Sequence, residues 1–215
     1  MSQQAPAFVL ASASPRRREL LAAMGIPFEV RASEVDESTI AADQPRTFAL
    51  RAAYAKAMDV ARRLPVGTPV LAADTVVALR SVLYGKPADA DDARHMLEQL
   101  SGETHEVITA IALARAGSLE CHLASETTAV TFRRLTAEEI DAYIATGEPF
   151  DKAGGYGIQG AAADLIDHID GDYFNVVGLP CGCLLELLER AGFEGAGAGE
   201  GGRAWKEPEA PGRWG

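Results

Sequence analysis

One short segment near the N-terminus sets the type of fold: Phe8-Val9-Leu10-Ala11-Ser12-Ala13-Ser14-Pro15-Arg16-Arg17. Its first four residues are apolar, as in a buried strand. Ser14 then fits the N-cap of a helix and Pro15 its first position, and apolar residues follow at helical spacing as far as Gly25. A buried strand that passes directly into a helix is typical of α/β proteins.

The alternation of strands and helices continues, so we expect one α/β domain over residues 1–193. The patterns predict further strands at 27–31, 69–73 with a continuation over 76–79, 105–115 and 121–133, and further helices at 47–63, 89–100, from 136 and over 177–188. Hydrophobic residues make up 47% of the chain, enough for a core. After Phe193, glycine, proline and charged residues replace the apolar period, which predicts a disordered Gly-rich tail over 194–215.

Composition excludes several classes of protein. The net charge of −11 argues against nucleic-acid binding, because an acidic surface repels phosphate backbones. No apolar run approaches the ~20 residues of a membrane span, and no signal peptide is recognisable, so we expect a cytoplasmic protein without a membrane partner. Three cysteines do not make a disulfide framework, and Cys181-Gly-Cys183 lacks a second pair of metal ligands.

The segment from Ser12 to Arg17 is the first candidate site. The free N–H groups and the dipole at the start of a helix favour anions. Arg16 and Arg17 add guanidinium groups that suit phosphate. An ordinary capped helix with a solvated basic turn explains the same residues equally well.

Asp74-Thr75 is the second candidate, because an apolar run of five residues ends there in a carboxylate. Ligands of open α/β sheets bind beyond the carboxyl ends of strands, and an Asp there can activate water or hold a cation. A turn Asp at a strand end is the structural alternative. Since Val76 and Val77 continue the strand pattern, we favour a functional Asp74.

Other residues give weaker signals on their own. Gly85-Lys86-Pro87 resembles a phosphate-binding loop but lacks the rest of a Walker motif. The match to G-x-G-x-x-G at 155–160 lacks the strand and helix that a dinucleotide site needs, which leaves either a loop with Gln159 contacting a base or a surface loop. Glu37 and Lys56, taken singly, are typical of solvated charges.

Taken together, these segments resemble the Maf family of nucleotide pyrophosphatases. The matching pieces occur in the order typical of the family over residues 8–193: Leu10-Ala-Ser-Ala-Ser-Pro-Arg-Arg17, Val35-Asp-Glu37, Ala55-Lys-Ala57, Ala73-Asp-Thr-Val-Val77, Gly85-Lys-Pro87, Leu100-Ser-Gly-x-x-His105, Asp151-Lys-Ala-Gly-Gly-Tyr-Gly-Ile-Gln-Gly160 and Asn175-Val-Val-Gly-Leu-Pro180. One piece alone carries little weight, whereas eight in order are specific.

The resemblance implies a fold, a reaction and a set of roles. The fold would be two lobes around a mixed, strongly twisted sheet with a deep central cleft, as a homodimer. The reaction would be the hydrolysis of a nucleoside triphosphate to a monophosphate and pyrophosphate, with a divalent cation such as Mg²⁺ or Mn²⁺. Asp74 would be the general base, and Glu37 with Asp74 would place the metal. The triphosphate would be held by Ser12, Arg16, Arg17, Glu37, Lys56 and Lys86.

Three positions indicate a branch within the family. Arg16, Thr75 and Gln159 resemble the branch that acts on dTTP and UTP. A side-chain amide such as Gln159 can donate to and accept from a pyrimidine edge, whereas 7-methyl-GTP, with its cationic base, is better suited by a carboxylate and an aromatic face. The alternatives are the 7-methyl-GTP branch, modified pyrimidine nucleotides as substrates, and a non-enzymatic regulator of cell division.

Overall fold

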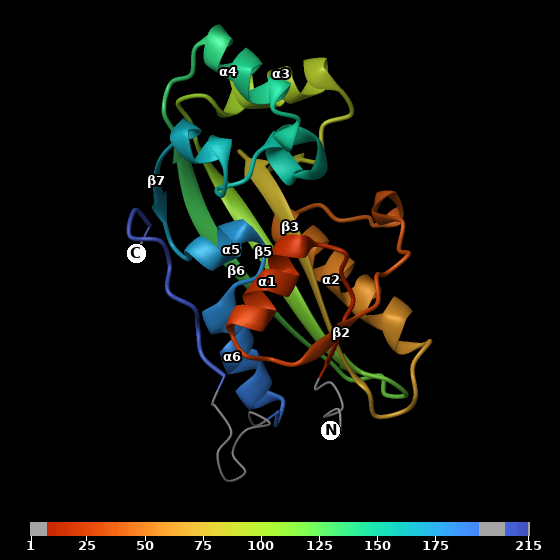
Figure 1. Ribbon diagram of the computed structural model, residues 1–215. Helices are drawn as coiled ribbons and strands as arrows, with labels where there is room; N and C mark the ends of the chain where they lie inside the picture. The colour runs from red at the N-terminus through yellow and green to blue at the C-terminus, as the bar shows by residue number, and fades with distance from the viewer. Residues whose placement is uncertain (1–7, 194–204, 215) are drawn as a thin grey trace.

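A computed structural model describes residues 8–193 and 205–214 and confirms the α/β class (Figure 1). The strands are β1 (Phe8–Leu10), β2 (Phe28–Val30), β3 (Pro69–Leu79), β4 (Val82–Tyr84), β5 (Thr104–Arg115), β6 (Cys121–Phe132) and β7 (Ile166–Asp170). The α-helices are α1 (Pro15–Ala23), α2 (Pro45–Ala61), α3 (Ala90–Leu100), α4 (Ala137–Ala145), α5 (Tyr173–Val177) and α6 (Cys181–Arg190).

All seven strands belong to one mixed sheet in the order β2-β1-β3-β5-β6-β7, with β4 paired to β3. β1 runs parallel to β2 and β3, and the pairs from β3 onward are antiparallel. The strands β5 and β6 have 12 residues each and are long enough to underlie two groups of helices. In Figure 1, α3 and α4 lie over one end of the sheet, apart from α1, α5 and α6.

Each face of the sheet has its own core. On one face, α2 packs through small side chains in a cluster that contains Ala49, Ala53 and Ala57 together with alanines of β3 and β5. On the other face, α1, α5 and α6 pack in a larger cluster of leucine, isoleucine and aromatic side chains. An Ala-rich helix face lets the α2 backbone approach the sheet closely, and this brings the polar residues of α2 near the sheet as well.

The edge of β3 that faces away from β5 is interrupted. β1 pairs with this edge at Val70 and Leu71, and β4 pairs with it from Val77 to Leu79. Within the described residues, 72–76 have a strand neighbour only on the other edge, which β5 covers continuously. A gap therefore opens in the sheet at Asp74 and Thr75.

Two expectations about elements were wrong in detail. Asp74 does not end a strand but lies in the middle of the 11-residue β3, because the strand alternation continues through it. Val177 does not belong to the last helix: it ends α5, and Gly178 with φ of 121° breaks the chain before α6 begins at Cys181. The short strands β4 and β7 were not foreseen, since β4 has only three residues and β7 has three polar residues among its five.

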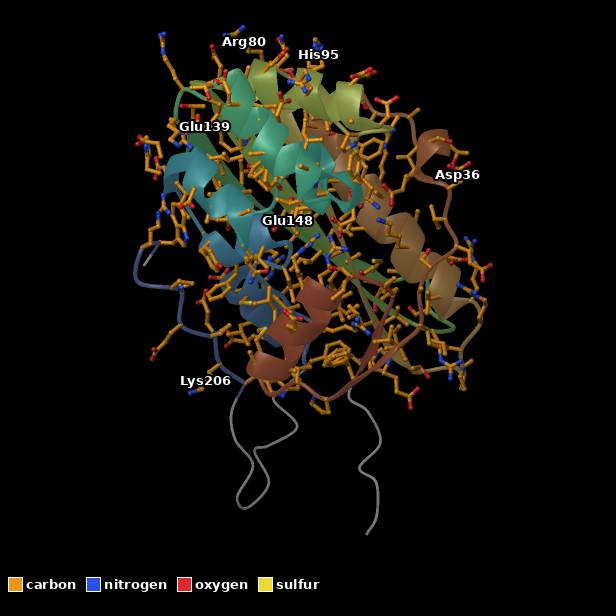
Figure 2. All side chains as sticks on the ribbon, turned by 45° about the horizontal axis from the view of Figure 1, so that its top comes forward. Asp36, Arg80, His95, Glu139, Glu148 and Lys206 are labelled. Carbon is orange, nitrogen blue, oxygen red and sulfur yellow. The ribbon has the colours of Figure 1, made fainter. Side chains whose placement is uncertain are left out.

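Only part of the C-terminal segment, for which the sequence predicts a disordered tail, lies among the described residues. Residues 194–204 and 215 lie outside the described part, while 205–214 has neither helix nor strand. Trp205 packs edge-on against Phe8 at 5.7 Å between ring centroids, and Trp214 is partly buried on the same core. The side chain of Lys206 points outward in Figure 2, and its backbone N–H donates to the Met24 carbonyl. The two tryptophans explain the contact, because they bury large apolar surfaces without any regular period.

No helix among residues 8–193 and 205–214 combines the length and the apolar character needed to cross a membrane.

The close packing of α2 gives a stability prediction. Ala53 is completely buried, so Ala53→Leu forces extra volume between α2 and the sheet. We expect the free energy of unfolding, measured with urea, to fall by about 1–3 kcal/mol. Ala22→Leu on the exposed face of α1 is the matched control and should change it little. Equal effects of the two substitutions would contradict close packing of α2.

Candidate active site

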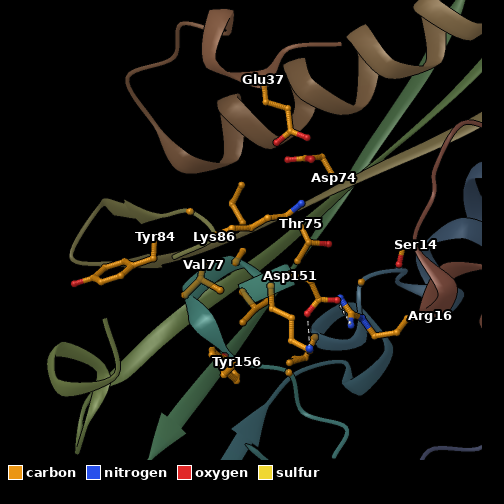
Figure 3. Close-up of a pocket in the computed structure, with 18 of the residues that line it drawn as sticks. Ser14, Arg16, Glu37, Asp74, Thr75, Val77, Tyr84, Lys86, Asp151 and Tyr156 are labelled. Atoms are coloured by element: carbon orange, nitrogen blue, oxygen red, sulfur yellow. Dashed lines mark hydrogen bonds and ion pairs between the residues drawn. The ribbon is translucent and has the colours of Figure 1, made fainter. Parts of the chain in front are cut away.

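A cavity of about 650 Å³ opens at the gap beside β3, and most of the candidate residues line it (Figure 3). Eight of them contribute to its wall: Arg16, Arg17, Glu37, Lys56, Asp74, Thr75, Lys86 and Gln159. Ser12 does not line it but lies behind Arg17. Side chains of successive strand residues point to opposite faces, yet Asp74 and Thr75 both reach the cavity because the sheet is open there.

A lysine between two carboxylates forms the first part of the site. Lys56, carried by α2, places its Nζ 2.6 Å from Asp74 Oδ1 and 2.7 Å from Glu37 Oε1. Glu37 begins a short 3-10 turn at Glu37–Thr39, and in Figure 3 its carboxylate points toward that of Asp74. Lys56 and Glu37, ambiguous as single residues, are thus brought together with Asp74.

The carboxylate of Asp74 is buried and only partly satisfied. The residue is 4% exposed, and its Oδ2 atom is buried without a hydrogen-bond partner. Burial raises the pKa of Asp74 above its ordinary value, while Lys56 and Arg17 act in the opposite direction. A carboxylate with a raised pKa and one free oxygen has the properties of a general base.

Arg17 is held on the other face of β3 by three hydrogen bonds. Its Nε donates to the Gly178 carbonyl at 2.8 Å, Nη1 to Ser12 Oγ at 3.1 Å and Nη2 to Thr75 Oγ1 at 3.0 Å. A guanidinium has five N–H donors, so two remain for a ligand. Ser12 and Thr75 therefore orient the Arg17 guanidinium, and Ser12 does so although it does not line the cavity.

Ser14 is at the N-cap position that the sequence indicates, but its side chain does not cap the helix. Instead its backbone N–H donates to Ser12 Oγ at 3.2 Å. Pro15 occupies the first turn as expected. Arg16 lies 3.7 Å from Asp151, a distance that leaves its guanidinium available to an anion.

Lys86 and Gln159 are exposed members of the cavity wall. Lys86 follows β4, and its side chain is drawn with those of Asp74 and Thr75 in the cavity wall (Figure 3). The loop that carries it is fixed by a hydrogen bond from the Gly154 N–H to the Gly85 carbonyl at 2.9 Å. Gly154 has φ of 68°, and a Cβ there would lie 2.9 Å from Val77, so this contact requires glycine.

Lys152 is a further positively charged side chain of the cavity wall, and it was not predicted from the sequence. Its Nζ donates to the Glu148 carbonyl at 2.6 Å and to Asp151 Oδ1 at 2.5 Å, which leaves one donor. A Cβ on Gly157 would lie 2.8 Å from the Lys152 stem, so glycine at 157 makes room for it. The signal was present in Asp151-Lys152 next to the glycine loop, but a polar turn gives no indication of where its lysine points.

The donor set fits a hard divalent cation only in part. In the part of the chain that the structure describes, no group of three or more His, Cys, Asp and Glu residues could hold a metal, and Cys181 and Cys183 are free thiols. The carboxylates of Asp74 and Glu37 are nevertheless oxygen ligands of the kind that Mg²⁺ and Mn²⁺ prefer. Mg²⁺ usually takes one or two protein carboxylates and completes its shell with water and substrate phosphates.

Comparison with known proteins identifies the family of this chain. A family model described as Maf-like protein matches residues 7–191. The chain belongs to the Maf family. Among its Maf relatives, the dTTP/UTP pyrophosphatase of Symbiobacterium thermophilum is 50% identical over 185 residues, which cover 86% of this chain and 94% of that protein. The dTTP/UTP pyrophosphatase of Myxococcus xanthus is 51% identical over 185 residues, with coverage of 86% and 92%.

A solved structure supports the same fold at low sequence identity. The HAM1 protein from Coxiella burnetii aligns with a TM-score of 0.50 at 19% identity, covering 86% of this Maf chain and 96% of the other. The similarity concerns the fold alone.

The raised pKa of Asp74 predicts a pH-dependent effect on stability. A group whose pKa is higher in the folded state favours folding at low pH and loses this contribution as pH rises through the folded pKa. We therefore expect Asp74→Asn to have a higher free energy of unfolding than the wild type at pH 8. The difference should shrink as pH falls to the ordinary Asp range, measured by urea unfolding at several pH values.

Asp59→Asn is a control, because the pKa of Asp59 is shifted in the direction opposite to that of Asp74. The Asp59 carboxylate accepts from the Glu34 N–H and from Ser33, and these hydrogen bonds, together with Arg63, lower its pKa. Asp59→Asn should be less stable than the wild type at pH 8, with a deficit that disappears at low pH. If Asp74→Asn is less stable than the wild type at pH 8, the conclusion that the buried Asp74 charge destabilises the folded state is wrong.

Proposed function

We propose that this protein is a nucleoside triphosphate pyrophosphatase that hydrolyses dTTP and UTP to the monophosphate and pyrophosphate. The observation that carries the proposal is the Asp74 carboxylate, which has one oxygen held by Lys56 and one free, in a cavity lined by Arg16 and Arg17. The relatives named dTTP/UTP pyrophosphatase support the choice of substrate.

In the proposed reaction, Asp74 takes a proton from a water molecule through Oδ2. The water oxygen attacks the α-phosphorus, the bond from this phosphorus to the bridging oxygen breaks, and pyrophosphate leaves with the bonding electron pair. Lys56 keeps Asp74 ionised through Oδ1, which opposes the effect of burial. The transferred proton leaves Asp74 for solvent, so no covalent intermediate with the protein is required.

The cations of the cavity would hold the triphosphate. Arg17 presents its two unused N–H donors, and Arg16, Lys86 and Lys152 add positive charge on other parts of the wall. Donors that are oriented before the reaction stabilise charge on phosphoryl oxygens without reorganisation. Glu37 and Asp74 would hold a divalent cation, which when bound neutralises charge on the same oxygens.

The base would lie against the apolar part of the wall. Tyr84, Tyr156 and Ile158 line the cavity, as does Gln159, whose amide can donate and accept at once. Thr75 would act on specificity through Arg17, to which it is hydrogen-bonded. A homodimer and a cytoplasmic location are further parts of this proposal that rest on the family resemblance.

A panel of nucleotides tests the substrate. Purified protein is incubated with dTTP, UTP, CTP, dATP, GTP and 7-methyl-GTP in the presence of Mg²⁺ or Mn²⁺, and released pyrophosphate is measured. We expect dTTP and UTP to be cleaved fastest, because Gln159 complements a pyrimidine edge. Preference for 7-methyl-GTP would replace the pyrimidine assignment, and the absence of any hydrolysis would overturn the enzymatic one.

Asp74→Asn tests the mechanism. The amide keeps the shape of the side chain but cannot accept a proton from water, so kcat for dTTP should fall by at least about 10²-fold. Asp59→Asn, outside the cavity, should retain kcat within about twofold. Thermal unfolding of both variants shows whether the fold is intact, and wild-type turnover in folded Asp74→Asn would remove Asp74 from the reaction.

A further inference from the structure

Behind Arg17, hydrogen bonds continue from the Thr75 hydroxyl to the buried Thr109, which has no part in the chemistry described so far. Thr75 Oγ1 is 2.9 Å from Thr109 Oγ1, and Thr109 Oγ1 is 2.9 Å from the main-chain oxygen of Asn175. Thr75 and Thr109 are direct partners in the β3–β5 register, so their side chains lie on the same face. Thr109 and Asn175 are completely buried.

The direction of each of these hydrogen bonds follows from the number of protons. A carbonyl oxygen only accepts, so the single hydroxyl proton of Thr109 is donated to Asn175. Thr109 must then accept from Thr75, whose own proton is used in that bond. Thr75 Oγ1 is thereby left as an acceptor that faces Arg17 Nη2 at 3.0 Å.

The helix α5 thus fixes Arg17 at two points. The Gly178 carbonyl, directly after α5, accepts from Arg17 Nε, and the Asn175 carbonyl acts on Nη2 through Thr109 and Thr75. The Asn175 side chain anchors the helix to the sheet through three bonds, to the Thr109 N–H, the Val107 carbonyl and Thr128 Oγ1.

We propose that Thr109 is a positioning residue for the reaction, because it orients the Thr75 hydroxyl so that Arg17 is held in one rotational state. The inference rests on the proposed pyrophosphatase function. Gly178 and Ser12 hold Nε and Nη1 of Arg17, and the lone pair of Thr75 Oγ1 is the acceptor that holds Nη2. Without the Thr109 acceptor, the Thr75 hydroxyl is free to rotate and can turn its proton toward Arg17. The Thr75 O–H and the Arg17 Nη2–H, both donors, then face each other.

The test compares Thr109→Val, which removes the hydroxyl, with Thr109→Ser, which keeps it. Both variants retain the backbone N–H that bonds to Asn175 Oδ1. We expect kcat/KM for dTTP to fall about tenfold in Thr109→Val, since small displacements of a positioned group cost one to two orders of magnitude. Thr109→Ser should stay within about twofold of the wild type. Equal losses in the two variants would overturn the proposal, and Thr109→Ser keeps it testable if Thr109→Val does not fold.

A double-mutant cycle separates positioning from general damage. Arg17→Lys lacks the planar guanidinium that Thr75 orients. If Thr109 acts through Arg17, Thr109→Val in the Arg17→Lys background should cause no further loss of kcat/KM. A further tenfold loss there would show that Thr109 acts by another route and would overturn the proposal.

Calorimetric binding of inorganic tripolyphosphate separates this inference from the proposed function. Affinity should fall in Thr109→Val and not in Thr109→Ser even if the wild type hydrolyses none of the nucleotides. Unchanged affinity in Thr109→Val, with the wild type binding normally, would count against the role of Thr109.

Discussion

The open edge of β3 at residues 72–76 is the constraint on which the rest of the site depends. A strand in the middle of a sheet normally has neighbours on both edges, and its alternating side chains are confined to two separate cores. Here the pairing of β1 with β3 ends at Leu71 and the pairing of β4 with β3 begins only at Val77, so Asp74 on one face and Thr75 on the other share one cavity. Lys56 approaches from α2 on the first face and Arg17 from α1 on the second.

Because of the same gap, the stability of the fold and the proposed catalytic role of Asp74 make opposite demands on its carboxylate. A carboxylate inside a sheet is costly unless it is paired, and Lys56 pairs only one of the two oxygens of Asp74. A second partner on Oδ2 would lower the free energy of the folded state but would also remove the acceptor that a base needs. Functional sites commonly retain this kind of local instability.

The sequence predicted the elements well and the contacts between them poorly. Buried strands and capped helices can be recognised from a few neighbouring residues, as in the capping box of Thr136 and Glu139, which the structure contains. Asp74 could be singled out because a carboxylate interrupts an apolar run. By contrast, the Gly178 carbonyl that holds Arg17 is 161 positions away, and Thr109 meets Thr75 through strand register alone. Glu37 and Lys56 became candidates only through the family resemblance, since an isolated charge carries no information about its partner.

The charge of the cavity explains how a chain of net charge −11 can present a site for a triphosphate. Five cationic side chains line the cavity, namely Arg16, Arg17, Lys56, Lys86 and Lys152, against four acidic ones, Asp36, Glu37, Asp74 and Asp151. The wall is therefore close to neutral, and Lys56 is already committed to two carboxylates. A triphosphate brings several negative charges, more than the small net positive charge of the wall can balance in a partly buried site. A divalent cation, which the proposed function includes, would reduce this excess of negative charge, and this electrostatic reason is independent of the family resemblance.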